Sequence, residues 1–174
     1  MATHGMIDLE TLHTTPKASV LTVGGVKFNP YDNSEPHSEF YFKLEFDSQD
    51  RDVSEDTLAW WSNQDPKAQE EAFGEDDRTP VIDFLYTLPK WINGVDVLWG
   101  HGYGFDITIL EDMLRQNKKN IPWNFWQVRD SRTLFSMCKS DPRKGIQKDL
   151  HNALADAYFQ AKGVQMAYKE LGLS

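Results

Sequence analysis

The 174-residue sequence contains a single cysteine, Cys138. One cysteine excludes an intrachain disulfide, and the sequence shows no cluster of cysteines and histidines with the spacing of a zinc site. No stretch resembles a secretory signal peptide, and no apolar run approaches the roughly 20 residues that cross a bilayer. These absences predict a cytoplasmic protein that has no membrane partner.

Basic side chains are also scarce, since 18 lysines and arginines face 27 acidic residues and give a net charge of −9. This balance argues against tight, passive binding to duplex DNA. The basic residues are unevenly distributed, because the segment Arg115–Lys148 holds nine of them and only two acids. Such a segment is able to guide a phosphate backbone, and an ordinary solvated loop explains it equally well.

Apolar and aromatic residues are plentiful, with a hydrophobic content of 40%, six tryptophans and ten phenylalanines. This composition indicates a packed globule, and the length predicts a single domain over residues 1–174. Apolar runs at residues 6–10, 19–28 and 39–46 predict a three-strand meander. Shorter strands are expected at residues 96–100 and 125–128, between helical segments. The fold class is therefore α/β, with a mixed five-stranded sheet of meander and parallel strands flanked by helices.

Acidic residues occupy three places where the predicted elements can present them together. Asp8 and Glu10 alternate on the first strand, so both face one side of it. Asp106 begins the predicted helix 105–116, and Asp156 lies inside the predicted helix 152–171. Four carboxylates that converge would repel one another, and a divalent cation would relieve that repulsion. Taken singly, each of these acids also fits ordinary surface charge.

His151 precedes Asp156 by five residues, which would place the two on different faces of one helix. We therefore expect His151 just before the helix, on a turn from which it can approach the carboxylates. A histidine has an ordinary pKa near 6.5, which suits a general base. A helix-capping role is the alternative interpretation.

The ordered motifs Asp-x-Glu at residue 8, Phe-Asp-x-x-x-Leu at residue 105 and His-x4-Asp at residue 151 resemble those of DEDDh 3′-5′ exonucleases. The segments 60–66, 99–106 and 129–133 are similar to those of the ribonuclease-T-like subfamily, which includes phage exonuclease A. The resemblance implies the ribonuclease H-like fold and a catalytic set of Asp8, Glu10, Asp106, His151 and Asp156. Their four carboxylates would bind two Mg²⁺ ions, for which Mn²⁺ can substitute.

The resemblance also implies substrate contacts, for which the candidates are Thr11, Leu12, Trp61, His101, Phe105 and Arg132. Leu12 follows the first predicted strand, and in relatives the residue at this place wedges against the terminal base. One of the adjacent tryptophans Trp60 and Trp61 is expected in the core, and the other at the groove, where it can stack on an unpaired base. His101 departs from relatives, which often carry Asn there. Arg132 also fits a structural role near the last strand.

The expected activity is metal-dependent 3′-5′ hydrolysis of single-stranded nucleic acid to mononucleotides, with DNA favoured as the substrate. A 3′-5′ exoribonuclease that trims RNA ends is the close alternative. A proofreading-type subunit of a replication or repair complex and an inactive binding scaffold are the further alternatives. The partners would be single-stranded DNA or RNA 3′ ends, in a bacterial or phage-infected cell. The sequence leaves the oligomeric state open, with a homodimer as one alternative.

Overall fold

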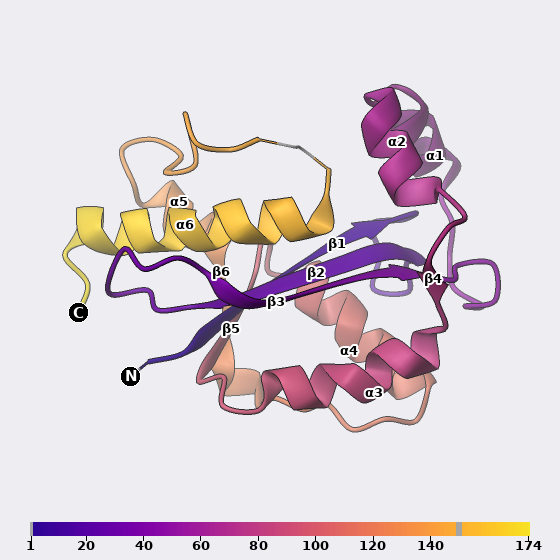
Figure 1. Ribbon diagram of the computed structural model, residues 1–174, viewed down its shortest axis with the longest axis horizontal. Coiled ribbons are helices and arrows are strands. Elements are labelled where there is room, and N and C mark those ends of the chain that lie inside the picture. Colours follow the sequence, from indigo (N-terminus) through magenta and orange to yellow (C-terminus); the bar gives the residue numbers. More distant parts are fainter. Residues whose placement is uncertain (1, 149–150) are drawn as a thin grey trace.

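The computed structural model describes residues 2–148 and 151–174, and its centre is one mixed sheet (Figure 1). The strand order is β4-β3-β2-β1-β5-β6. The first three strands form the expected antiparallel meander, whereas β5 and β6 run parallel to β1. The strands are β1 (His4–Thr11), β2 (Val20–Phe28), β3 (His37–Leu44), β4 (Arg78–Thr79), β5 (Val97–Gly100) and β6 (Val128–Asp130).

Helices cover both faces of the sheet (Figure 1). On one face lie α5 (Ser131–Ser136) and α6 (Ala153–Leu171), and on the other lie α3 (Val81–Ile92) and α4 (Asp106–Gln116). The helices α1 (Glu55–Ser62) and α2 (Pro66–Phe73) form a hairpin beyond one end of the sheet, near the start of α6. Within the residues described, no helix combines the length and apolar character needed to cross a membrane.

The sheet has six strands, one more than the expected five. The additional strand, β4, has two residues and pairs in parallel with the end of β3. Thr79 belongs to this strand, and Pro80 takes the N-cap position of α3. A two-residue strand shows no alternation of apolar and polar side chains, so no sequence pattern reports it.

The last strand also begins later than expected. Residues Phe125–Gln127 form a 3₁₀ turn, η1, and β6 starts at Val128. The turn is closed by a capping box, in which the backbone nitrogen of Asn124 donates to Oε1 of Gln127 at 2.8 Å. The expected strand at residues 125–128 was therefore wrong over its first three residues, because this local capping competes with sheet pairing.

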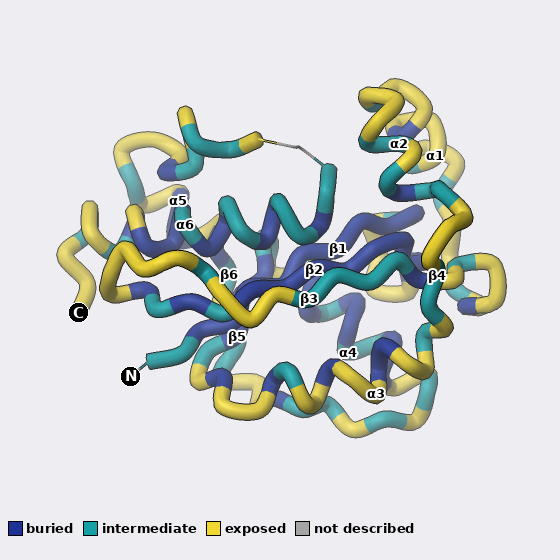
Figure 2. The backbone as a smooth tube through the Cα atoms, in the orientation of Figure 1, coloured by how far each residue is buried: buried dark blue, intermediate teal, exposed yellow. Residues whose placement is uncertain are grey.

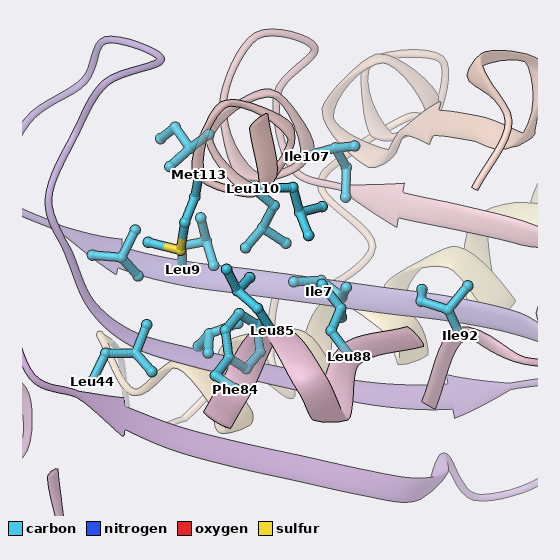
Figure 3. Close-up of a cluster of buried hydrophobic side chains, with 14 of the residues drawn as sticks. Ile7, Leu9, Leu44, Phe84, Leu85, Leu88, Ile92, Ile107, Leu110 and Met113 are labelled. Carbon is cyan, nitrogen blue, oxygen red and sulfur yellow. The ribbon is translucent and has the colours of Figure 1, made fainter. Parts of the chain in front are cut away.

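β1 lies at the middle of the fold and is buried along its whole length (Figure 2). Ile7 and Leu9 pack with α3 and α4 in the larger apolar cluster (Figure 3). Met6 packs on the opposite face with α6. Because side chains alternate along a strand, Asp8 and Glu10 lie on the same face as Met6. The strand therefore presents both carboxylates toward α6.

Gly24 on β2 pairs with Asp8 and lets the start of α6 approach the sheet. A Cβ atom at Gly24 would lie 2.5 Å from the backbone nitrogen of Leu154. A contact that short would push the helix away, so this position requires the absence of a side chain. The close approach brings the first turn of α6 over the two carboxylates of β1.

Candidate active site

The predicted acidic residues and His151 line one cavity of about 710 Å³. It opens beside the end of β1, between the α1–α2 hairpin and the start of α6. Asp8, Glu10, Asp106 and Asp156 are all buried in its wall. The structure thus brings together residues that are up to about 150 positions apart in the sequence.

The tightest group in the cavity consists of Glu10, His151 and Asp156. One ligand atom of each lies within 4.8 Å of those of the other two. Asp156 reaches this place because Asn152 caps α6, its side chain accepting a hydrogen bond of 3.0 Å from the backbone nitrogen of Ala155. The cap begins the helix at Ala153 and places Asp156 in the first turn, above Glu10.

Asp106 is fixed by the backbone on both of its oxygens. Its Oδ1 accepts from the backbone nitrogen of Leu9 at 3.0 Å, and its Oδ2 accepts from that of His101 at 2.9 Å. The nitrogen of Leu9 is available because β1 pairs with β5 only over His4–Met6. Asp106 therefore joins the first turn of α4 to the sheet and keeps one carboxylate orientation.

The four carboxylates strongly disfavour being ionised together. Burial, followed by the charges of Asp106 and Glu10, raises the pKa of Asp8 well above its usual range. Burial and the charge of Asp156 do the same to the pKa of Glu10. Burial raises the pKa of Asp106 to about 7, and burial also raises the pKa of Asp156. A positive charge placed among these groups would restore their ionised form.

This group of residues also fits a divalent cation in its chemistry. Among the described residues, Oδ2 of Asp8 and Oδ1 of Asp156 are buried without any hydrogen-bond partner. Buried polar atoms are normally paired, so an unpaired carboxylate oxygen indicates that a ligand binds to it. Hard cations such as Mg²⁺ bind carboxylate oxygens.

Gln160 supports Asp8 and was missed from the sequence. Its Nε2 donates to Oδ1 of Asp8 at 3.0 Å, and its side chain is buried in the cavity wall. It follows Asp156 by four residues and therefore lies on the same face of α6. That spacing is the signal that could have identified it.

His151 lies just before the N-cap of α6, as predicted, and has a positive φ of 67°. Its ring packs edge to face against Trp60, with centroids 4.8 Å apart. A positive φ is uncommon for a residue other than glycine, and strained backbone of this kind persists where surrounding contacts hold it. The position next to Glu10 and Asp156 agrees with a role in catalysis as well as with the start of the helix.

The choice of Trp61 as the groove residue needs correction. Trp61 borders the cavity but is only 2% exposed, and its Nε1 donates to the backbone oxygen of Thr11 at 2.9 Å. Trp60 is 44% exposed and also lines the cavity. Adjacent residues on a helix point about 100° apart, so burying one exposes the other. Trp60 is the ring available to a base.

Leu12 also lies elsewhere than expected. It is 4% exposed and packs with Leu21, Trp61 and Ala72 beneath the hairpin, outside the cavity lining. The prediction that Leu12 wedges against a base is therefore wrong for this conformation. After β1 the chain turns back, with the nitrogen of Leu12 bonded to the oxygen of Ser19 at 2.9 Å, and the side chain is directed into the core.

Thr11 and Phe105 do line the cavity. Thr11 is buried, and its hydroxyl donates to the backbone oxygen of His13 at 2.6 Å. Phe105 precedes the first turn of α4 and packs against the larger apolar cluster. Both residues border the cavity, and their contact with a substrate stays a prediction.

His101 lines the cavity in a neutral form. Ser131 Oγ donates to the oxygen of Gly100 at 3.0 Å, so it must accept from Nδ1 of His101, which lies 2.9 Å away. This arrangement places the ring proton on Nδ1. Burial, followed by the charges of Arg143 and Arg132, lowers the pKa of His101 to about 4. His101 therefore stays uncharged near neutral pH.

The basic segment Arg115–Lys148 does not act as one surface. Of its nine basic residues, only Arg132 and Arg143 line the cavity. Arg132 lies in the first turn of α5, and Arg143 lies in the loop that leads to His151. Arg143 was not among the predicted contacts, because a loop position has no periodic pattern that could place it.

Comparison with known proteins agrees with these motifs. The family model of the 3′-5′ exoribonuclease Rv2179c-like domain matches residues 3–168. The chain is similar to an exodeoxyribonuclease of Enterobacteria phage T4, with 29% identity over 157 residues. The similarity covers 74% of this chain and 68% of the phage protein.

Solved structures share the fold at low sequence identity. The nuclease domain of 3′hExo, a DEDDh family member bound to rAMP, superposes with a TM-score of 0.60 at 15% identity, covering 98% of this chain and 92% of that one. Pop2p of S. pombe in its Mg²⁺ and Mn²⁺ bound form superposes with a TM-score of 0.62 at 13% identity, covering 94% of this chain and 82% of Pop2p. Exonuclease X in complex with 5′ overhanging duplex DNA has a TM-score of 0.56 at 17% identity, covering 98% of this chain and 93% of exonuclease X.

The chain belongs to the 3′-5′ exoribonuclease Rv2179c-like domain family and is a 3′-5′ exonuclease, and its fold is the ribonuclease H-like fold of the DEDDh nucleases.

Proposed function

We propose that the enzyme removes mononucleotides one at a time from the 3′ end of single-stranded DNA. Asp8, Glu10, Asp106 and Asp156 would hold two Mg²⁺ ions, and His151 would act as the general base. The observation that carries this proposal is the group formed by Glu10, His151 and Asp156, in which a base lies within 4.8 Å of two buried carboxylates.

Bound Mg²⁺ would supply the positive charge that favours an attacking hydroxide and stabilises the leaving oxygen. The protein contributes four carboxylates in fixed positions, since Asp106 is held by two backbone nitrogens and Asp8 by Gln160. His151 accepts the proton of the attacking water at a ring nitrogen. A new bond forms between water oxygen and phosphorus, and the bond to the 3′ oxygen of the preceding nucleotide breaks. The products are a nucleoside 5′-monophosphate and a strand shortened by one residue.

Single-stranded substrate is supported by Trp60, whose exposed ring borders the cavity. An aromatic ring binds an unpaired base by stacking on its face. A base inside a duplex is not available for this contact, because its faces are already stacked on neighbouring bases. DNA is supported by the similarity to the phage exodeoxyribonuclease. RNA is the second candidate, and the exoribonuclease family model supports it.

The test uses DNA and RNA oligonucleotides of one sequence, single and double stranded, labelled at the 3′ or 5′ end, with Mg²⁺ or Mn²⁺. We expect 3′-labelled strands to release labelled mononucleotide at once, and 5′-labelled strands to shorten as a ladder. Faster cleavage of RNA than of DNA would assign the enzyme to RNA. Release of mononucleotides from the 5′ end would contradict the proposal.

A further inference from the structure

The cavity carries two arginines beside its carboxylates, and the reaction as described uses neither. Arg132 lies in the first turn of α5, with its Nε 3.8 Å from where a Cβ atom of Gly102 would lie. Its guanidinium therefore lies against the loop that joins β5 to α4. Within residues 2–148 and 151–174, no acceptor bonds this guanidinium, so its charge is available to a ligand.

Arg143 is held in place by its neighbours. Its Nη2 lies 2.7 Å from Oδ2 of Asp141, and its Nε donates to Oδ1 of the same residue at 3.1 Å. The guanidinium also lies over the ring of Phe135, with 5.2 Å to the centroid. These contacts occupy Nε and Nη2, and no acceptor within residues 2–148 and 151–174 bonds Nη1. Arg143 is therefore a preorganised donor, whereas Arg132 forms no salt bridge with any residue in the described part of the chain.

The two arginines act on the same part of the cavity wall. Both of their charges oppose protonation of His101, which lies between β5 and α5. A guanidinium presents several N–H donors in one plane and binds phosphate more specifically than an ammonium group does. Among the described residues, neither guanidinium forms an ion pair with one of the four cavity carboxylates, so N–H donors of both are available to a phosphate.

A strand with a 3′ hydroxyl has no phosphate on the 3′ side of the scissile linkage. Any second phosphate in the cavity must therefore come from the next linkage on the 5′ side. We propose that Arg132 and Arg143 form a subsite for this internal phosphate, one nucleotide upstream of the bond that is cleaved. The inference rests on the proposed 3′-5′ hydrolysis and names a binding contact in the same cavity.

The subsite predicts that the two arginines matter more for an oligonucleotide than for a substrate with one phosphate. The p-nitrophenyl ester of thymidine 5′-monophosphate contains only the scissile phosphate. A short oligothymidylate contains the upstream phosphate as well. In Arg132→Gln and Arg143→Gln, the ratio of kcat/KM for the oligonucleotide to kcat/KM for the ester should fall roughly ten- to hundred-fold, the range for a lost charged hydrogen bond.

Lys144→Gln is the matched control, since it removes the same charge from an exposed residue that does not line the cavity. It should leave the ratio unchanged. Arg143→Gln loses contacts to Asp141 and Phe135, so melting curves accompany each variant. Arg132→Gln loses no side-chain hydrogen bond recorded for the described residues, and it keeps the test decisive if Arg143→Gln fails to fold.

A third substrate locates the contact. The oligonucleotide carries a neutral methylphosphonate in place of the upstream phosphate only. For the wild-type enzyme, kcat/KM should fall on this substrate by about the factor that Arg132→Gln loses on the unmodified oligonucleotide. For Arg132→Gln, the methylphosphonate should lower kcat/KM no further. Equal losses on the ester and the oligonucleotide would overturn the proposal, because the arginine would then act at the scissile phosphate. If the wild type hydrolyses neither the ester nor the unmodified oligonucleotide, the proposed nuclease function itself fails.

Discussion

The indole ring of Trp60 meets the imidazole ring of His151 edge to face, with centroids 4.8 Å apart and planes at 83°. The ring of Trp61 approaches the same imidazole at 6.1 Å. Trp60 and Trp61 belong to α1, whereas His151 belongs to the loop before α6. The proposed general base is therefore held against the α1–α2 hairpin, which makes this hairpin a part of the catalytic site.

Replacing His151 by alanine separates catalysis from helix capping. A lost general base should lower the rate by roughly 10²–10⁴. The melting temperature should change little, because Asn152 provides the cap of α6. Steady-state kinetics and thermal melts on one preparation measure both effects. His37→Ala, at an exposed position of β3, should match the wild type. A lower melting temperature with wild-type turnover would leave His151 as a capping residue.

Replacing the two adjacent tryptophans should affect different properties, folding stability for Trp61 and substrate binding for Trp60. Trp61→Ala removes a buried ring and should cost about 3–5 kcal/mol of folding free energy. Trp60→Ala should change stability little, but it should weaken binding of a single strand by about 1–3 kcal/mol through lost stacking. Urea denaturation and KM measure the two quantities. Equal losses of stability in both variants would show that Trp60 is a core residue.

Asp8→Asn and Asp156→Asn should each lose several orders of magnitude in rate while the fold persists. Each substitution removes one negative charge from four crowded carboxylates, so the metal-free variants should be at least as stable as the metal-free wild type. EDTA should abolish wild-type activity, and Mg²⁺ should restore it. Turnover close to that of the wild type in either variant would remove that residue from the proposed metal site.

The stability of the metal-free protein should fall as pH rises. Burial raises the pKa of Asp106 from 3.8 to about 7, and burial and the neighbouring carboxylates also raise the pKa values of Asp8 and Glu10 well above their usual range. The folded state therefore binds protons more tightly than the unfolded chain does. The stabilisation from Asp106 is complete below about pH 4 and is lost as pH rises through about 7.

Thermal melts in EDTA and in Mg²⁺, from pH 6.5 to 8, measure this effect, because the interval includes the raised pKa of Asp106. It also stays above the range in which His4 and His101 contribute. Burial lowers the pKa of each to about 4, so their contributions have the opposite sign and are lost only as pH falls below 6.5. The stabilisation by Mg²⁺ should grow across the interval. Asp8→Asn should flatten the dependence in EDTA. A melting temperature in EDTA that is constant across the interval would contradict the raised pKa values.

Cleavage should require a free 3′ end. A circular single strand should resist the enzyme, whereas the same circle opened by one cut should be degraded to mononucleotides. Gel electrophoresis of both forms over one time course provides the measurement. If circles are cut as fast as linear strands, the enzyme is an endonuclease.

Local patterns predicted the parts of the site that depend on one element. The alternation of Asp8 and Glu10 on a strand and the position of His151 before a helix both follow from short-range geometry. The mixed sheet followed from the order of apolar runs, and its sixth strand did not, because β4 is only two residues long.

Contacts across the chain could not be predicted in the same way. Whether Trp60 or Trp61 is buried depends on how α1 rotates against Leu12 and Leu21, which the eight residues of α1 do not decide. The hydrogen bond from Gln160 to Asp8 joins positions 152 residues apart. Arg143 reaches the cavity through a loop without periodicity. These features depend on tertiary packing, which local patterns report only weakly.

The bare backbone at Gly24 couples the seating of one helix to the completeness of the active site. Asp8 and Glu10 lie on β1 and Asp106 on α4, whereas Asp156 comes from α6, whose first turn rests against Gly24. A side chain at position 24 would displace that turn, and with it Asp156 and the adjoining His151. The sheet alone therefore presents an incomplete set of carboxylates, and the set is completed only when α6 docks.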